Sequence, residues 1–216
     1  MEITWLGHSC FKLRGREASV VTDPPSKKTG YTIGRPTANV VTISHDHEGH
    51  SNVKAVTGDP RVIQGPGEFE VAGVLIKGTS TYHDQEQGAE RGKNTAYVME
   101  IDELRICHLG DLGHVPTPEQ VEELSGIDIL LAPVGGGSTI DAKAAAETVS
   151  LLDPRLVIPM HFETPTSKDK LDPVDAFLKE IGSPKALEEK QSKLSITKST
   201  LPQETKVQVL DYRGSS

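Results

Sequence analysis

Short runs of β-favouring residues, separated by turn residues, fill the first half of the chain. They predict strands at 3–6, 10–13, 19–22, 39–43, 61–63, 69–71, 74–77, 95–101 and 104–109. Asp102-Glu103 lies between two such runs, which predicts a tight hairpin turn. Residues 23–36, DPPSKKTGYTIGRP, are too rich in proline and glycine for a regular element. We expect them to form a loop that crosses the face of a site.

The second half of the chain alternates helices with strands. Thr117 supplies an N-cap hydroxyl, Pro118 occupies the first helical position, and Gly126 follows the end, so a helix is predicted between them. The same signals predict helices at 141–152 and 173–181, apolar strands at 127–131 and 156–158, and late strands at 193–197 and 206–210. The pattern indicates one α/β domain over residues 1–216.

Composition narrows the class of protein. The 216 residues contain 31 acidic and 23 basic side chains, giving a net charge of −8, and no block of five like charges occurs. This argues against a nucleic-acid-binding surface, which requires clustered basic residues. Charged residues within the first twenty positions leave no secretory apolar segment, and no apolar run approaches the roughly 18 residues of a membrane span. We expect a cytoplasmic protein that binds neither nucleic acid nor membrane, in which Cys10 and Cys107 are reduced core residues.

Three of the eight histidines fall within six residues, in SHDHEGH. Residues i and i+2 after a strand point to the same side, so His45 and His47 are predicted to bind one metal ion together. His50 lies one step further and would face a neighbouring position. Imidazole suits zinc, and also iron, nickel or manganese in oxygen-rich sites. The alternative is a surface histidine cluster without a ligand.

Further motifs follow the same order as those of a known family. They are WLGHSCF at the start, VVTDP with Asp23, TYHD with His83, LGDLG with Asp111, APVGGG at 132–137 and VIPMH ending in His161. With the 45–50 cluster, the chain resembles the metallo-β-lactamase superfamily, and more narrowly its branch of ascorbate-6-phosphate lactonase and related metal-dependent hydrolases. The resemblance covers most of the chain. It implies an α/β fold, a four-layer αββα sandwich with metal ions held by loops at one end of the two sheets.

The resemblance also implies a ligand set, with one gap. The first metal ion would be held by His45, His47 and His83, the second by His50 and His161, and Asp111 would bridge them. The family pattern H-x-H-x-D-H has an aspartate for the second metal ion where this chain has Gly49. Asp46 and Glu48 are the neighbouring carboxylates that could replace it. Asp111, His50 and His161 with a water suffice for a catalytic zinc, so one or two divalent ions are expected.

For several other residues the sequence leaves more than one role open. Asp23 resembles the family's aspartate that supports ligating histidines by hydrogen bonding. His8 is either a ligand-supporting or substrate-contacting residue or a core residue, and His114 is either structural or at the rim of the site. Residues 135–139, GGGST, either receive an anion or form a plain turn. Arg91, with Lys93 and Asn94, either contacts substrate or is solvated.

A site of this composition is typical of metal-assisted hydrolysis. A bound metal lowers the pKa of water from about 16 toward about 7 and polarises the oxygen of the group under attack. We therefore expect a hydrolase that uses a metal-activated hydroxide on a small-molecule ester, lactone or phosphoester, with Asp111 as the catalytic residue that passes a proton to the leaving group. Two alternatives remain. One is a degenerate member that binds a metal ion or ligand without turnover, which Gly49 motivates, and the other is an RNA-processing nuclease. A homo-oligomer is also left open.

Overall fold

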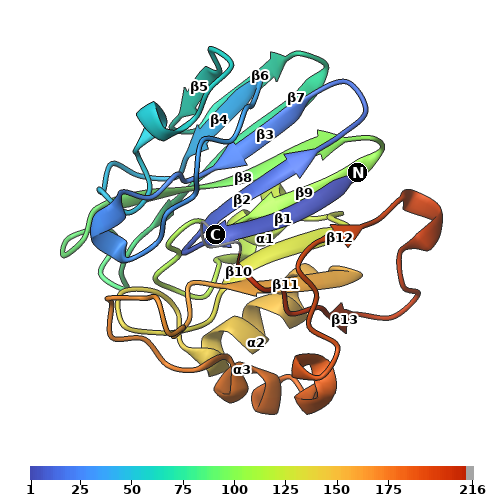
Figure 1. Ribbon diagram of the computed structural model, residues 1–216. Helices are drawn as coiled ribbons and strands as arrows, with labels where there is room; N and C mark the ends of the chain where they lie inside the picture. Colours follow the sequence, from blue (N-terminus) through green and yellow to red (C-terminus); the bar gives the residue numbers. More distant parts are fainter. Residues whose placement is uncertain (213–216) are drawn as a thin grey trace.

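Two mixed β-sheets, packed face to face, form the centre of the molecule (Figure 1). The computed structural model describes residues 1–212. The first sheet has the strand order β12-β1-β2-β3-β4-β5, with bounds Leu194–Ser195, Glu2–Gly7, Cys10–Arg14, Ser19–Thr22, Val40–Ile43 and Arg61–Gln64. The second has the order β13-β11-β10-β9-β8-β7-β6, with bounds Lys206–Val207, Leu156–Met160, Ile129–Pro133, Leu104–His108, Lys93–Ile101, Val74–Tyr82 and Gly67–Val71.

Each predicted strand is present, most of them with bounds within two residues of the prediction, and three strands differ more in length. β7 continues five residues beyond the predicted end, because it pairs with β8 as far as the Tyr82–Lys93 register. The two late strands shrink to two residues each, because each pairs with only one neighbour at a sheet edge. Asp102 and Glu103 form the predicted turn, both with a left-handed backbone at φ 51° and 67°. Cys10 and Cys107 are buried and free, as predicted.

Among the residues that the structure describes, three α-helices cover the outer face of the second sheet (Figure 1). They are α1 (Pro118–Leu124), α2 (Ala142–Leu152) and α3 (Val174–Glu180). Thr117 and Gln120 form a complete capping box at the start of α1, and Asp141 caps α2 through the backbone N–H of Ala144. In the described part of the chain, no helix is long and apolar enough to cross a bilayer.

Within residues 1–212, no α-helix covers the outer face of the first sheet. Strand alternation sends Ile3, Trp5 and Phe11 into the central core, while Val21 and Val41 face outward. That outer face forms a second apolar cluster with Ala38, Ile33, Val53 and Val56, which come from the 23–38 loop and from around the 3₁₀ turn Val53–Ala55. Two helix-or-loop layers therefore flank the two sheets, as the expected four-layer α/β sandwich requires, but the layer on the first sheet consists of loops and short 3₁₀ turns.

Strand direction brings the candidate residues to one end of the sheets. β1, β3 and β4 run the same way in the first sheet, as do β7, β9, β10 and β11 in the second. The candidate residues each follow the carboxyl end of one of these strands: His8, Asp23, His45–His50, His83, Asp111 and His161. Carboxyl ends of parallel strands meet at the same edge, so the site assembles there.

Candidate metal centre

One carboxylate oxygen of Asp111 lies at the centre of a histidine cluster. Asp111 Oδ2 is 3.1 Å from His50 Nε2, 3.4 Å from His83 Nε2, 3.6 Å from His161 Nε2 and 3.9 Å from His45 Nε2. All five side chains are buried. Asp111 is held in place by Asn94, whose side-chain oxygen accepts the Asp111 backbone N–H at 3.0 Å, and by the Ser9 hydroxyl, 3.3 Å from Oδ1.

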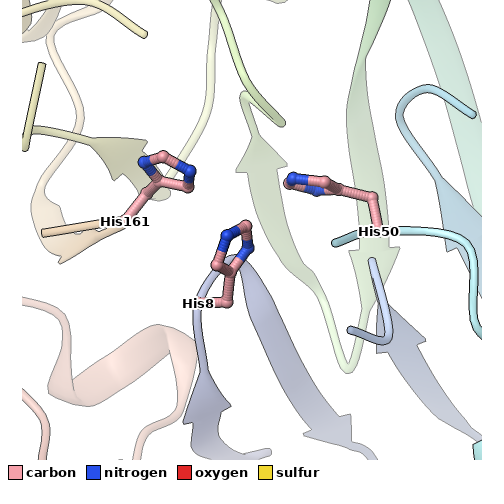
Figure 2. A group of neighbouring side chains, drawn as sticks. All are labelled: His8, His50 and His161. Carbon is pink, nitrogen blue, oxygen red and sulfur yellow. The ribbon is translucent and has the colours of Figure 1, made fainter. Parts of the chain in front are cut away.

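The histidines form two groups around this carboxylate. His45, His47 and the neighbouring His83 make one group, in which a ring nitrogen of each lies within 4.8 Å of the others. The second group has the same spacing and contains His50, His161 and His8 (Figure 2). Since Asp111 Oδ2 contacts members of both groups, Asp111 occupies the position of a bridge between them.

Backbone turns in the 45–50 segment separate its histidines into the two groups. The His47 N–H donates to the His45 carbonyl at 3.1 Å, and the His50 N–H donates to the His47 carbonyl at 2.9 Å. The Ser26 N–H donates to the Glu48 carbonyl at 2.9 Å, which fixes this turn against the 23–36 loop. His47 is exposed at the mouth of the site, whereas His45 and His50 are buried.

Asp23 orients the histidines from behind. Its carboxylate accepts the Ser44 N–H at 2.8 Å, the Ser44 hydroxyl at 2.5 Å and His50 Nδ1 at 2.9 Å. Ser44 Oγ also lies 2.9 Å from His45 Nδ1. These bonds leave the Nε2 atoms of both histidines directed at Asp111. Asp23 therefore supports the ligand set, although Asp23, His45 and His50 are close enough to form a third group. The sequence analysis did not identify Ser44, although its place between the strand and the first histidine could have marked it as a residue that supports the ligands.

Burial sets the protonation of the cluster. Burial, with the charge of His50, lowers the pKa of His45 to about 3, and burial lowers the pKa of His161 to about 4. Burial would raise the pKa of Asp111, but the charges of His161 and His50 hold it well below its usual range. Burial would lower the pKa of His50, yet the Asp111 and Asp23 carboxylates raise it to about 10. His45 and His161 are therefore neutral and Asp111 is ionised, which are the forms that bind a cation, whereas His50 has to release a proton when a cation binds.

Unpartnered ring nitrogens show that the site fits a divalent metal ion. His45 Nε2, His83 Nδ1, His161 Nδ1 and His8 Nδ1 are buried without a hydrogen-bond partner in the described chain. Each such atom costs about 1–3 kcal/mol when it stays unsatisfied. Imidazole nitrogens around a carboxylate are a donor set that suits zinc. A cation beside Asp111 would satisfy His45 Nε2, and it would meet His83 and His161 through the Nε2 atoms that face Asp111.

Three of the weaker candidates lie outside the cluster. Asp46 is exposed, and Glu48 is exposed and paired with Lys28 Nζ at 2.7 Å. His114 is occupied by the backbone, since Nε2 accepts the Tyr82 N–H at 3.2 Å and Nδ1 donates to the Val115 carbonyl at 2.8 Å. None of the three lines the cleft above the cluster.

That cleft has a volume of about 530 Å³. Besides the cluster it is lined by Thr29 from the 23–36 loop, Gly137 and Ser138 from the glycine run, Arg91, Asp169, Lys170 and Leu171. Arg91 is placed by Asp84, whose carboxylate accepts the Arg91 backbone N–H at 2.7 Å and three others in the same loop. Asn94 instead holds Asp111 within the protein, and Lys93 is absent from the lining.

A family model described as a β-lactamase superfamily domain matches residues 2–161. A UPF0173 metal-dependent hydrolase of Nitratidesulfovibrio vulgaris is 32% identical over 197 residues, covering 75% of this chain and 80% of the relative. A UPF0173 protein of Pyrococcus furiosus is 30% identical over 192 residues, covering 78% and 87%. This chain belongs to the UPF0173 family of the metallo-β-lactamase superfamily.

A crystal structure of another superfamily protein agrees with this assignment. It is a Thermotoga maritima protein provisionally named as a Zn-dependent hydrolase of the metallo-β-lactamase superfamily. The two chains are 42% identical with a TM-score of 0.79, and the match covers 98% of the UPF0173 chain and 99% of the Thermotoga protein. The fold inferred from the motifs is thus shared along nearly the whole chain.

Proposed function

We propose that this UPF0173 protein is a metal-dependent hydrolase that acts on a small-molecule ester, lactone or phosphoester. The observation that carries the proposal is Asp111 Oδ2, which lies within 3.9 Å of four buried imidazole nitrogens below an open cleft. When bound there, divalent metal ions lower the pKa of water toward about 7 and polarise the bond under attack. The names of the Nitratidesulfovibrio and Thermotoga relatives support hydrolysis, and the latter makes zinc the first ion to test.

The residues of the cluster have two roles in this proposal, metal binding and proton transfer. His45, His47 and His83 would hold one ion, His50 and His161 would hold another, and Asp111 lies between the two groups. Asp111 also accepts a proton from the attacking water and returns it to the leaving group.

The charged residues that line the cleft narrow the class of substrate that it would bind. Arg91 and Lys170 line it and favour a substrate that carries a phosphate or carboxylate. A volume of about 530 Å³ suits a small molecule. The resemblance to the ascorbate-6-phosphate lactonase branch makes phosphorylated lactones the first compounds to assay. The two relatives above are named as UPF0173 proteins, and none of the comparisons names that branch.

The experiment is a turnover screen of lactones, carboxylic esters and phosphodiesters with zinc- and manganese-loaded protein. Asp111→Asn keeps the shape of the side chain but removes the charge, and should abolish turnover. Asp46→Asn is the matched control, because Asp46 is exposed and lies outside the cleft lining. The proposal fails if metal-loaded protein turns over none of these classes, which would favour the member that binds without catalysis.

A further inference from the structure

The family pattern leaves one ligand unaccounted for at the second metal position, because Gly49 has no side chain. The two neighbouring carboxylates do not fill it: Glu48 pairs with Lys28 at the surface, and Asp46 is exposed outside the cleft lining. We propose that His8 is the missing ligand, so that His8, His50 and His161 together hold the second metal ion beside Asp111. This deepens the proposed function, because it concerns the same metal centre.

The first observation is that His8 occupies the space beside Gly49. A Cβ atom built on Gly49 would lie 3.1 Å from His8 Cε1 and 3.6 Å from His8 Nε2. The first of these distances is tighter than most Cβ contacts in proteins, so a longer side chain at position 49 would meet the imidazole ring directly unless the ring shifts. Aspartate at position 49 and the present placement of His8 are therefore alternative ways to use one space.

The second observation is that His8 completes a three-histidine group. Its ring centroid lies 4.8 Å from that of His50 and 4.5 Å from that of His161, and a ring nitrogen of each lies within 4.8 Å of the others. Figure 2 shows the three rings turned toward one another from three separate segments. Three imidazoles at this spacing match the protein ligands of a catalytic zinc site.

The third observation is that the two ring nitrogens of His8 face different surroundings. Nδ1 is buried without a hydrogen-bond partner in residues 1–212, and Nε2 lies 3.4 Å from Asp169 Oδ2. Histidine ligands commonly give one nitrogen to the metal and the other to a carboxylate. His50 is arranged similarly, with Asp23 Oδ2 at 2.9 Å from its Nδ1.

The backbone holds His8 in this position at some cost. His8 has a left-handed conformation at φ 56°, which is uncommon for a residue other than glycine. Its carbonyl accepts the indole N–H of Trp5 at 2.9 Å and the His161 N–H at 3.3 Å. His161 is also left-handed, at φ 52°. Strained residues of this kind gather at functional sites, where the surrounding structure holds them.

The test reads metal binding rather than turnover. Zinc per chain is measured by plasma mass spectrometry after equilibration at buffered free zinc, with affinities from competition with a chromophoric chelator. Wild type should bind two equivalents. His8→Asn, chosen because asparagine tolerates a left-handed backbone, should weaken only the second by at least about 100-fold, since even outer partners of a ligand are worth 10–100-fold.

Two further variants control the result. His47→Ala should weaken the other site and leave the His8 site in place. His8→Ala/Gly49→Asp transfers the ligand to the family position and should recover the second equivalent, whereas Gly49→Asp alone should not tighten it. If His8→Asn does not fold, the double variant decides: a folded protein with two equivalents supports the proposal and one equivalent overturns it.

If folded His8→Asn bound two equivalents of zinc per chain with unchanged affinity, the assignment of His8 as a ligand would be overturned. A single equivalent of zinc in wild type would overturn it too. A failed substrate screen leaves this stoichiometry intact, so the two proposals fail separately.

Discussion

Replacing Asp23 with asparagine tests how the ligand histidines are oriented. Asp23 is fully buried and accepts three hydrogen bonds, two from Ser44 and one from His50 Nδ1. Asparagine keeps the shape and tolerates the φ of 39° at this position. Its NH₂ group, however, donates, so at least one buried donor that now faces an oxygen loses its acceptor.

The expected cost follows from that single mismatch. One unsatisfied buried group costs about 1–3 kcal/mol of unfolding free energy. For a chain of this size, each kcal/mol lowers the melting temperature by about 2–4 °C. When the amide nitrogen takes the place of Oδ2, the Ser44 hydroxyl and His50 Nδ1 both lose their acceptor, and His50 loses the bond that directs Nε2 to Asp111. Losing such a partner typically weakens metal binding about 10–100-fold.

Urea unfolding of chelator-treated protein measures the first effect, and zinc competition measures the second. Asp46→Asn is the control, since it makes the same chemical change on an exposed side chain. If Asp23→Asn matched wild type in both assays, the carboxylate would not orient His50, and the reasoning from these three hydrogen bonds would be refuted.

Three other predictions follow from the site. Removing metal should lower thermal stability without unfolding the protein, because the apolar core is separate from the cluster. Zinc at 100 times its Kd should restore about 2.7 kcal/mol of unfolding free energy, measured by calorimetry. Complete unfolding on chelation would instead make the metal structural. Unfolding free energy of metal-free protein should fall as pH drops from about 6.5 toward 4, because the pKa values of His45 and His161 are lowered to about 3 and 4, so the unfolded chain binds protons first. His161→Asn should reduce that slope in urea titrations, and an identical slope would contradict it. Arg91→Ala should raise KM for phosphate-bearing substrates several-fold and leave uncharged lactones unaffected; equal changes for both would show that Arg91 does not select charge.

Local sequence signals determined the elements of this fold. The capping box at Thr117, the hairpin turn at Asp102-Glu103 and the period-2 alternation of the early strands each depend on residues within a few positions, and the structure has all of them. The length of a strand beyond its predicted apolar run does not follow from such local signals. β7 extends to Tyr82 because β8 is there to pair with it, which involves residues in a separate segment.

Some candidate ligands can be recognised from the sequence, and others only from the tertiary structure. His45, His47 and His50 are recognisable because they lie within one short segment, and Asp111 and His161 through their motifs. The sequence left open whether any residue would compensate for Gly49, and the neighbours Asp46 and Glu48 were the carboxylates that could. Only the tertiary structure brings His8 to that space, because the end of β1 lies next to the ends of β4 and β11 when the sheets pack.

The sequence by itself thus determined the strands, the caps and the chemical type of the site, because hydrogen bonding within a turn and alternation along a strand are short-range effects. The packing of the two sheets decided which distant side chains share one ion and which buried nitrogens lack a partner. It also decided that loops and 3₁₀ turns cover the first sheet. Those outcomes depend on distances between separate segments of the chain, such as those of His8 and His161, and no local pattern in the chain encodes them.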